Sequence, residues 1–465
     1  MSQANEPNID EFQDVELTPA ERKFEKIITP FQQFVRQETA SGLLLMICTV
    51  LALLIANSFL AYDYQHLLHI PVSIGVGSWS LDLTLHHVIN DGLMTLFFFV
   101  VGLEIKREFL VGELSRPSQA MLPIVAAIGG MVVPAGLYAL INFGGPGAHG
   151  WGVPMATDIA FAVGIMALLG KRVPAALFTF LVALAIVDDL GAVAVIAIFY
   201  TDSLNFDALG AAGALLALLI GMNYVNVRRA WVYFIVGLLL WYAMHASGVH
   251  ATIAGVLTAW TIPAKSRMSP RSFALLATKL VKRYRKHLCR EENGDCDMDD
   301  LQQRRGVIQS LEDGVHAQES LLQRLEHKLH TPVAFLIIPL FALANAGIPI
   351  EFGKLDEAIA HPVALGVIVG LVVGKTVGIG GMAWLAIKLG IAAPPTGAST
   401  PHLFGAALLG GVGFTMSIFI AELGYPGLPH ELLMAKTGIL IASLFAGVCG
   451  YLVLRSIPSV KPTGE

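Results

Sequence analysis

Long apolar runs are the feature that most limits how this chain can fold. A transmembrane helix needs about 20 mainly apolar residues. Only 14% of the residues are charged, whereas a soluble domain carries about 25%. The sequence therefore predicts an all-α polytopic membrane protein with about twelve transmembrane helices. The runs lie near residues 41–62, 84–105, 119–143, 153–170, 174–199, 206–225, 230–246, 248–262, 332–349, 362–386, 403–422 and 432–454.

Lys and Arg residues alternate between the two sides of these predicted spans. Basic groups precede the first run, follow the second, fourth and sixth, and fill the segment 263–331. The loops after the first, third, fifth and seventh runs carry none. Because cytoplasmic loops hold the excess of Lys and Arg, we expect both termini in the cytoplasm. The chain also begins with a polar stretch, so no cleavable signal peptide is expected.

This pattern divides the chain into five parts. They are a cytoplasmic N-terminal segment (1–40), spans 1–8 (41–262), a cytoplasmic loop insertion (263–331), spans 9–12 (332–456) and a cytoplasmic tail (457–465).

The segment 71–83 alternates apolar and small residues outside the predicted membrane. Val72, Ile74 and Val76 precede a Gly77-containing turn, and Trp79 begins a second alternating run. This pattern predicts a small external β-hairpin, although an ordinary ordered loop is the alternative. An isolated hairpin is marginally stable in water, so a second copy of the chain is the expected partner.

The loop 263–331 predicts a basic helix, LATKLVKRYRKHL, followed by an amphipathic one. The basic helix is expected near anionic lipid headgroups. Two roles are open for the loop. It either only connects the spans on each side of it, or its basic helix changes the electrostatic potential at the nearby cytoplasmic ends of the spans. Between the helices, Asp295, Asp297 and Asp299 have the opening spacing of a calcium loop. Asp300 and Gly306 stand where that motif requires Gly and Glu, so the prediction is a solvated acidic turn.

Two adjacent aspartates, Asp188 and Asp189, interrupt the apolar run ALAIVDDLGAVAVIAIF. A charge in the middle of a membrane costs about 2.5–3.5 kcal/mol, so such residues usually mark an ion path. Neighbours on a helix point about 100° apart. We therefore expect one aspartate to face a water-filled cavity and the other to pair with Lys375. The alternative, an ion pair that only fixes packing, leaves one aspartate without a role.

A second intramembrane carboxylate, Asp158, follows Thr157 in a short run flanked by proline and glycine. The late run GGVGFTMSIFI, with Thr415 and Ser417, is its counterpart in the second half. Paired interrupted spans are the best sequence indication of a transporter site. The alternative for the hydroxyl groups is a bond back to their own helix.

Other titratable residues lie near the ends of spans. Asp91 lies in the second run, and His250 occupies a turn between short runs, where it is equally well explained as structural. A larger set predicts a cytoplasmic funnel of coupled carboxylates and imidazoles, although ordinary interfacial charges would look similar. Its members are Glu104, Glu108, Glu326, His327 and His330.

Several long ordered runs resemble the NhaA family of sodium/proton antiporters between about residues 37 and 456, apart from most of 265–320. They are NDGLMTLFFFVVGLEIKRE, PMATDIAFAVGIMALLG, ALAIVDDLGAVAVIAIFYT, SGVHATIAGV, RLEHKLH, PLFALANAG and GVGFTMSIFIA. The loop looks longer than expected for the family, and Thr376 follows Lys375 where proline is expected.

The resemblance implies an inverted repeat in which broken spans 4 and 11 cross. It places Thr157 and Asp158 beside the crossing, pairs Asp188 with Lys375 and makes Asp189 the principal Na⁺/H⁺ carboxylate. It further implies a pH-responsive funnel and a homodimer formed through the hairpin.

The activity implied is electrogenic exchange of Na⁺ or Li⁺ for more than one proton in a bacterial inner membrane. No cofactor and no nucleic-acid partner are expected. Asp188 and Asp189 would bind the transported Na⁺, and no other metal ion is expected.

Two other classes of membrane protein are compatible with intramembrane aspartates. An intramembrane aspartyl protease needs two facing aspartates, such as Asp158 and Asp189, but it has no use for Lys375. A passive cation channel needs a continuous pore, whereas broken helices around one midplane site favour alternating access.

Overall fold

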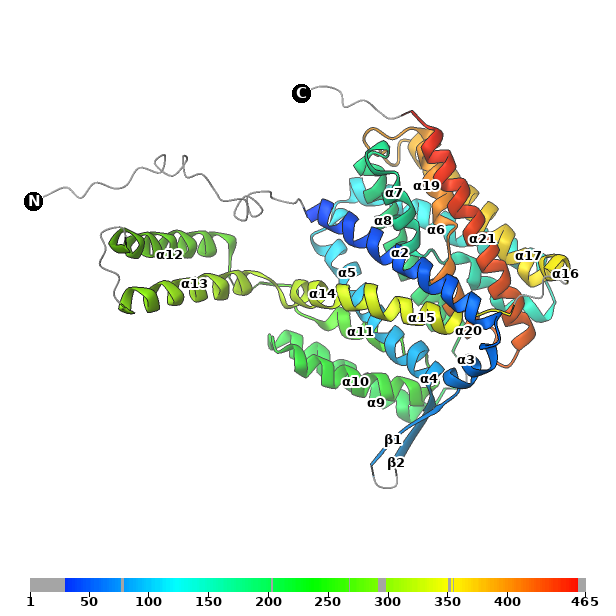
Figure 1. The fold of residues 1–465 in the computed structure, drawn as a ribbon, viewed down its shortest axis with the longest axis horizontal. Helices are drawn as coiled ribbons and strands as arrows, with labels where there is room; N and C mark the ends of the chain where they lie inside the picture. The colour runs from blue at the N-terminus through cyan, green and yellow to red at the C-terminus, as the bar shows by residue number, and fades with distance from the viewer. Residues whose placement is uncertain are drawn as a thin grey trace, which may run out of the picture.

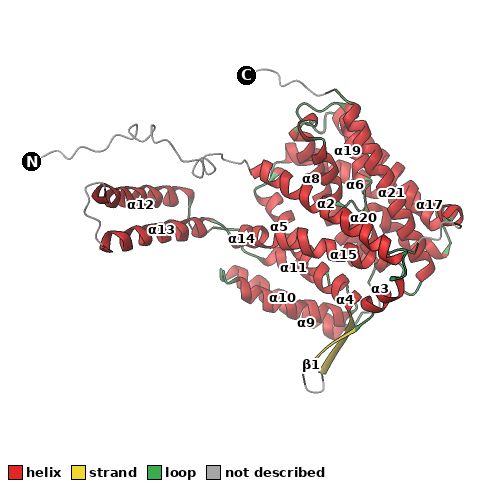
Figure 2. Cartoon of the chain, in the orientation of Figure 1, coloured by secondary structure: helices red, strands yellow, loops and turns green. Residues whose placement is uncertain are grey.

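The computed structural model describes residues 30–76, 79–201, 204–266, 268–291, 298–349, 353 and 355–458. These residues are almost entirely helical, and the single sheet is one small hairpin (Figure 2). Most helices pack side by side in one bundle (Figure 1). The predicted all-α polytopic class is confirmed.

Nine helices in the described residues are long and apolar enough to cross a membrane. Six are single helices or nearly so: α2 (Pro30–Ala56), α6 (Pro117–Ile141), α8 (Ala175–Phe199), α9 (Phe206–Tyr224), α10 (Ala230–Ser247) and α21 (Pro429–Ser456). Three contain π-helical turns. The first is α4 (Leu85–His87), η2 (Val88–Leu93) and α5 (Met94–Leu110); the second is α14 (Leu321–Pro332), η6 (Val333–Ile337) and α15 (Ile338–Asn345); the third is α17 (Pro362–Val369), η8 (Gly370–Gly374), η9 (Thr376–Gly381) and α18 (Met382–Lys388).

Two further spans are bent at a short break, as predicted for spans 4 and 11. One is η4 (Pro146–Met155) with α7 (Ile159–Leu168), bent by 44°. The other is α19 (Thr400–Gly410) with α20 (Phe414–Gly424), bent by 45°. Counting each pair as one gives eleven candidate spans among the described residues.

The predicted span 248–262 is shorter than expected. Only α11 (Ile253–Thr261) is helical there, because a turn precedes it and Pro263 follows it. This helix packs closely on α5, since a side chain on Gly255 would lie only 2.4 Å from the Thr95 carbonyl. Lys106 of α5 also donates to the carbonyls of Trp260 and Ile262, at 2.6 Å each. A cation is stabilising at a helix C-terminus.

The helix that contains span 9 extends in the N-terminal direction beyond the predicted apolar run. The helix begins at Leu321 rather than near 332, and its first turn is closed by a capping box between Ser320 and Gln323. The Ser-x-x-Gln spacing is a sequence signal for such a start. This boundary places Glu326, His327 and His330 on the same helix that continues into the bundle.

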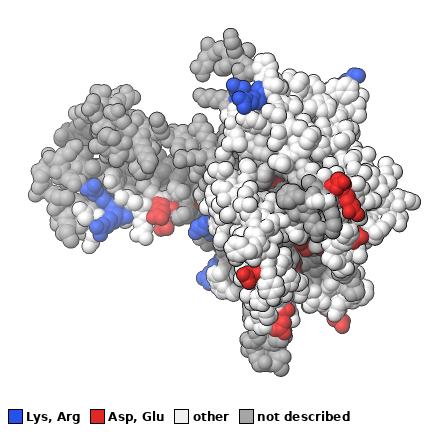
Figure 3. All heavy atoms as spheres, turned by 45° about the vertical axis from the view of Figure 1, so that its right-hand side comes forward, with Lys and Arg blue, Asp and Glu red and all other residues white. Residues whose placement is uncertain are grey.

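The surface of the bundle is apolar, as contact with lipid requires. Large side chains such as Leu54, Val132, Ile198 and Leu444 are 63–71% exposed. Figure 3 shows few charged side chains across the visible face of the bundle. The chain is therefore an integral membrane protein.

Small residues let α6 and η9 approach closely. A side chain on Gly129 would lie 2.3 Å from the Gly378 carbonyl, and one on Gly378 would lie 2.2 Å from the Gly129 carbonyl. Only glycine fits at both positions. This contact holds the π-helical stretch that contains Lys375 against the middle of α6.

Strands β1 (Pro71–Val76) and β2 (Trp79–Thr84) form the expected hairpin, with antiparallel register from Pro71 opposite Thr84 to Val76 opposite Trp79. It projects from the bundle (Figure 1). The turn residues 77 and 78 lie outside the described residues.

Helices α12 (Pro270–Glu291) and α13 (Met298–Gln318) form a helical hairpin that extends away from the bundle (Figure 1). The amphipathic helix predicted after the basic one is divided between α13 and α14, because Ser320 caps the start of α14. The acidic turn predicted around residues 295 and 297 lies outside the described residues.

The remaining short elements connect the spans. They are α3 (Ala61–Leu68), η3 (Glu113–Ser115), η5 (Gly170–Arg172) and α16 (Leu355–Ala360).

Candidate functional site

Lys375 and Asp188 meet in the centre of the bundle. The Lys375 Nζ atom lies 2.5 Å from Asp188 Oδ2, and the two side chains are 0% and 1% exposed. Lys375 also donates to Thr157 Oγ1 at 3.0 Å. The Thr157 hydroxyl in turn donates to the Gly410 carbonyl at 2.8 Å. This chain of contacts joins α8, the Lys375 segment and both broken spans.

Asp158 lies at the break of the first bent span. Its Oδ1 accepts from the Phe161 N–H at 3.0 Å and so caps the N-terminus of α7. Its Oδ2 accepts from the Thr415 N–H at 3.0 Å and from the Thr415 hydroxyl at 2.5 Å. The Asp158 N–H donates to the Val412 carbonyl at 2.7 Å. The carboxylate therefore offsets the positive ends of two helices at the place where they cross.

Asp189 differs from both of these carboxylates. It is 1% exposed, and neither of its oxygens accepts a hydrogen bond from the described part of the chain. A buried charge without a partner is costly, so the fold keeps this group available at some expense of stability.

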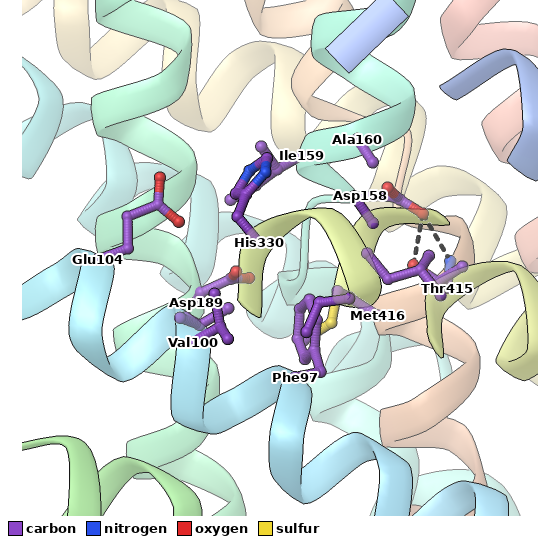
Figure 4. Close-up of a pocket in the computed structure, with 14 residues that line it drawn as sticks. Phe97, Val100, Glu104, Asp158, Ile159, Ala160, Asp189, His330, Thr415 and Met416 are labelled. Atoms are coloured by element: carbon purple, nitrogen blue, oxygen red, sulfur yellow. Dashed lines mark hydrogen bonds between the residues drawn. The ribbon is translucent and has the colours of Figure 1, made fainter. Parts of the chain in front are cut away.

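The Asp189 side chain lines a cavity of about 70 Å³ between α5, α7, α14–η6 and α20. Asp158, Thr415 and Glu104 line the same cavity, together with His330 (Figure 4). A single water needs only about 10–15 Å³ by this measure, so the space admits a small cation with some of its water. Most of the lining is apolar, but three of its five polar residues are carboxylates, and carboxylate oxygens suit a hard cation.

The charge balance of the site is negative. The positive charge of Lys375 compensates the negative charge of Asp188. Asp158 and Asp189 line the cavity and add two further negative charges when they are ionised. No group of three or more His, Cys, Asp and Glu residues in the described ranges is arranged to hold a resident metal ion.

Four of the five predicted funnel residues form two sets. Glu104 and His330 line the Asp189 cavity, as given above. Glu108 and Glu326 instead flank Arg107, whose guanidinium nitrogens lie 2.9 Å from an oxygen of each. His327 is exposed on α14. Among the funnel residues, the bridging role of Arg107 was not predicted, because only the fold brings α5 against α14.

Two of the three accessory candidates, Asp91 and His250, lie away from this site. Neither lines the Asp189 cavity. His250 is close enough to Asp91 for their charges to interact, as are His86, His87 and His245. Asp91 belongs to the π-helical turns of η2. The third accessory candidate, Thr415, is part of the central site through its two bonds to Asp158.

Comparison with known proteins agrees with this geometry. The profile of a family described as Na⁺/H⁺ antiporter 1 matches residues 32–454. The chain belongs to the NhaA family of Na⁺/H⁺ antiporters. It is 52% identical to Na(+)/H(+) antiporter NhaA 1 of Saccharophagus degradans, over 95% of this chain and 94% of that one. It is 50% identical to Na(+)/H(+) antiporter NhaA of Sulfurimonas denitrificans, over 94% of this chain and 98% of that one.

A third relative, Na(+)/H(+) antiporter NhaA of Oleidesulfovibrio alaskensis, is 47% identical over 94% of this chain and 96% of that one. Such matches cover nearly all of both proteins. The expectation that the loop at 263–331 is longer than usual for the family stays a prediction.

Membership of the NhaA family assigns the chain to transporters rather than enzymes, and its ions are substrates rather than cofactors. The protease alternative also disagrees with the geometry. Both oxygens of Asp158 accept hydrogen bonds from Phe161 and Thr415, so this carboxylate is held at the break of its helix rather than hydrogen-bonded to Asp189 as a catalytic pair would be.

Proposed function

We propose that this antiporter uses Asp189 as the carboxylate that exchanges Na⁺ or Li⁺ for protons. The single observation that supports this assignment is the contrast between the two adjacent aspartates. Asp188 is neutralised by Lys375 at 2.5 Å, whereas Asp189 has no hydrogen-bond partner among the described residues and lines a cavity that it shares with Asp158, Glu104 and Thr415.

Competition at one carboxylate is sufficient to couple the two fluxes. Asp189 binds either a cation or a proton, so cation binding displaces the proton. Alternating access then carries whichever species is bound from one side of the membrane to the other. The two broken spans are the elements best placed to change arrangement, because their breaks meet beside Asp158.

The exchange is electrogenic if more than one proton moves for each Na⁺. A second titratable group is then required beside Asp189. Asp158 lines the same cavity. Asp188, the neighbour of Asp189 on α8, forms its ion pair with Lys375 of the π-helical stretch. An inward proton gradient would drive sodium extrusion across a bacterial inner membrane, with both termini in the cytoplasm.

The pH response belongs to the funnel in this proposal. Arg107 bridges Glu108 on α5 to Glu326 on α14, and Glu104 and His330 on the same two helices reach the cavity. Protonation of these coupled groups changes the charge that a cation meets on its way to Asp189.

The test is Na⁺-driven proton movement in proteoliposomes with the membrane potential clamped by K⁺ and valinomycin. Proton release from the lumen on addition of outside Na⁺, faster when the lumen is held positive, supports electrogenic exchange. Na⁺ flux that ignores the proton gradient would indicate a channel and contradict the proposal. Exchange that does not respond to the clamp would remove the electrogenic part only.

A further inference from the structure

Four polar side chains join four spans on the side of the bundle that carries the β1–β2 hairpin. Glu422 Oε1 lies 2.6 Å from Lys436 Nζ and 3.9 Å from His86 Nε2. The same His86 nitrogen lies 3.0 Å from Asn345 Oδ1. His86 belongs to α4, which directly follows the hairpin, Asn345 to α15, Glu422 to α20 and Lys436 to α21. This hairpin-side cluster therefore joins spans 2 and 9 to spans 11 and 12.

The hairpin-side cluster lies beyond the Asp189 cavity on helices that also line it. On α20, Thr415 lines the cavity, and Glu422 is seven residues further, two turns along the same face. On span 9, His330 and Ile338 line the cavity, and Asn345 is again seven residues beyond Ile338. Because His330 belongs to the funnel end of that span, the cavity lies between the funnel and the hairpin-side cluster.

Three buried aromatic rings lie between the cavity and the cluster. Phe98, Phe341 and Phe419 are 1%, 0% and 1% exposed. The centroid of the Phe419 ring lies 5.3 Å from that of Phe98 and 6.2 Å from that of Phe341. On α20, Phe419 comes between Thr415 and Glu422. Since an ion leaves water for a dry apolar layer only at a high cost, the route from the cavity to the hairpin side is closed at these rings.

The contacts of α20 are unequal on its two sides. Toward α21, the helix is held at both ends, because Glu422 pairs with Lys436 and the Phe414 N–H donates to Ser443 Oγ at 3.2 Å. Toward span 2, Glu422 has only the 3.9 Å approach of His86. Helices α20 and α21 therefore form one unit, and the weaker contact lies between this unit and span 2.

We propose that His86 and Glu422 form the gate contact on the hairpin side of the antiporter. The contact holds α20 against span 2 while the cavity faces the funnel, and it parts when the cavity opens to the hairpin side. Helices α20 and α21 then move together, and Phe419 leaves the rings of Phe98 and Phe341. This proposal rests on the alternating access of the proposed function.

Crosslinking tests whether this contact must part. His86→Cys with Glu422→Cys, in a background with the four native cysteines replaced by serine, places one thiol on each side of the gate contact. Water reaches both positions, since the native side chains are 24% and 17% exposed. A bifunctional methanethiosulfonate should stop Na⁺-driven proton release in proteoliposomes, and a reductant that cleaves the link should restore it. Exchange that continues in protein shown by mass spectrometry to be crosslinked would overturn the proposal.

The matched control keeps Glu422→Cys and moves the second thiol to Lys436→Cys. This crosslink joins α20 to α21 within one unit, so exchange should continue. A block by this crosslink as well would overturn the proposal, because α20 and α21 would then move against each other. Exchange before crosslinking tests the proposed ion site, whereas its loss after crosslinking tests the gate contact.

A second measurement needs no transport. Asn345→Cys, in the same serine background, places a thiol beside His86 at a position that is 1% exposed in the native protein. Adding Glu422→Gln should speed labelling by an impermeant maleimide from the hairpin side about two- to fivefold, the scale set by a partly exposed ion pair. Glu357→Gln, an exposed carboxylate on α16, is the control and should leave the labelling rate unchanged. Equal labelling rates with and without Glu422→Gln would overturn the gate contact, whatever the outcome at Asp189.

Discussion

Lys375 and Asp188 form an ion pair that no solvent reaches: Nζ lies 2.5 Å from Oδ2, and the side chains are 0% and 1% exposed. The next residue on the helix, Asp189, is equally buried but accepts no hydrogen bond from the described residues. Two adjacent carboxylates thus have opposite surroundings. One forms an ion pair between two segments of the bundle, and the other is the carboxylate that we propose exchanges ions.

Replacing Asp188 by Asn should destabilise the protein. The change leaves the Lys375 ammonium buried without its counter-charge, and breaking a buried pair in this way costs about 3–5 kcal/mol. Thermal unfolding in detergent measures the loss. The double variant Asp188→Asn with Lys375→Met, which removes both charges, should recover much of the stability. An unchanged melting temperature for the single variant would mean that the pair does not stabilise the fold.

Replacing Thr415 by Val should weaken the crossing of the two broken spans. It removes the hydroxyl bond to Asp158 and keeps the backbone N–H bond. A hydrogen bond to a charged group contributes about 1.5–3 kcal/mol, so a clear fall in melting temperature is expected. Thr415→Ser, which keeps the hydroxyl, should behave nearly as the wild type. Similar stability for Val and Ser would argue that the backbone bond alone holds Asp158.

Deleting the hairpin tip should separate a dimer without stopping exchange. The two strands leave both outer edges unpaired within the described sheet, and an isolated hairpin is marginal in water. Removal of residues 73–82, with a short Gly-Ser turn in their place, should convert dimer to monomer in light scattering of the detergent complex. A dimer that survives the deletion would place the interface elsewhere.

Removing the α12–α13 hairpin should leave both the maximal exchange rate and its pH profile intact. The hairpin extends away from the bundle, and its ends meet where the Met268 N–H donates to the Ala317 carbonyl at 3.1 Å. Residues 269–316 can therefore be replaced by a few glycines without stretching the chain. Because fields of exposed charges are screened over about 8 Å at physiological salt, the basic face of α12 has little reach to the funnel.

Two results would contradict this expectation. A pH profile that shifts at low salt and returns with added choline chloride would show electrostatic action of the basic helix. A shift that ignores salt would show a mechanical link through α14.

Much of the fold could be predicted because its sequence signals do not depend on tertiary contacts. A long apolar run indicates a transmembrane helix whatever that helix packs against. The glycine and proline residues near Asp158 and Thr415 indicate breaks in their helices for the same reason. The limits of two helices were not predicted. The helix of span 9 begins at the capping box of Ser320, and α11 is shorter than the apolar run because a turn precedes it and Pro263 follows it.

The candidate site was harder to predict where partners are distant in the chain. Lys375 could be matched to an aspartate because few charges lie inside the membrane. The Val412 and Gly410 carbonyls, which accept from Asp158 and Thr157, carry no sequence signal, because every residue has a carbonyl. The same holds for Arg107, whose position between two carboxylates depends on how α5 packs on α14.

The most direct test of the proposed mechanism is Na⁺-driven proton release by Asp189→Asn in proteoliposomes, with luminal pH reported by a trapped dye. The amide cannot trade a proton for a cation, so exchange should be abolished, while the melting temperature should not fall, because no partner of Asp189 is lost. Asp63→Asn, an exposed carboxylate on α3, is the control and should exchange as the wild type does. Retained Na⁺-driven proton release by Asp189→Asn would contradict the assignment of Asp189 as the exchanging carboxylate.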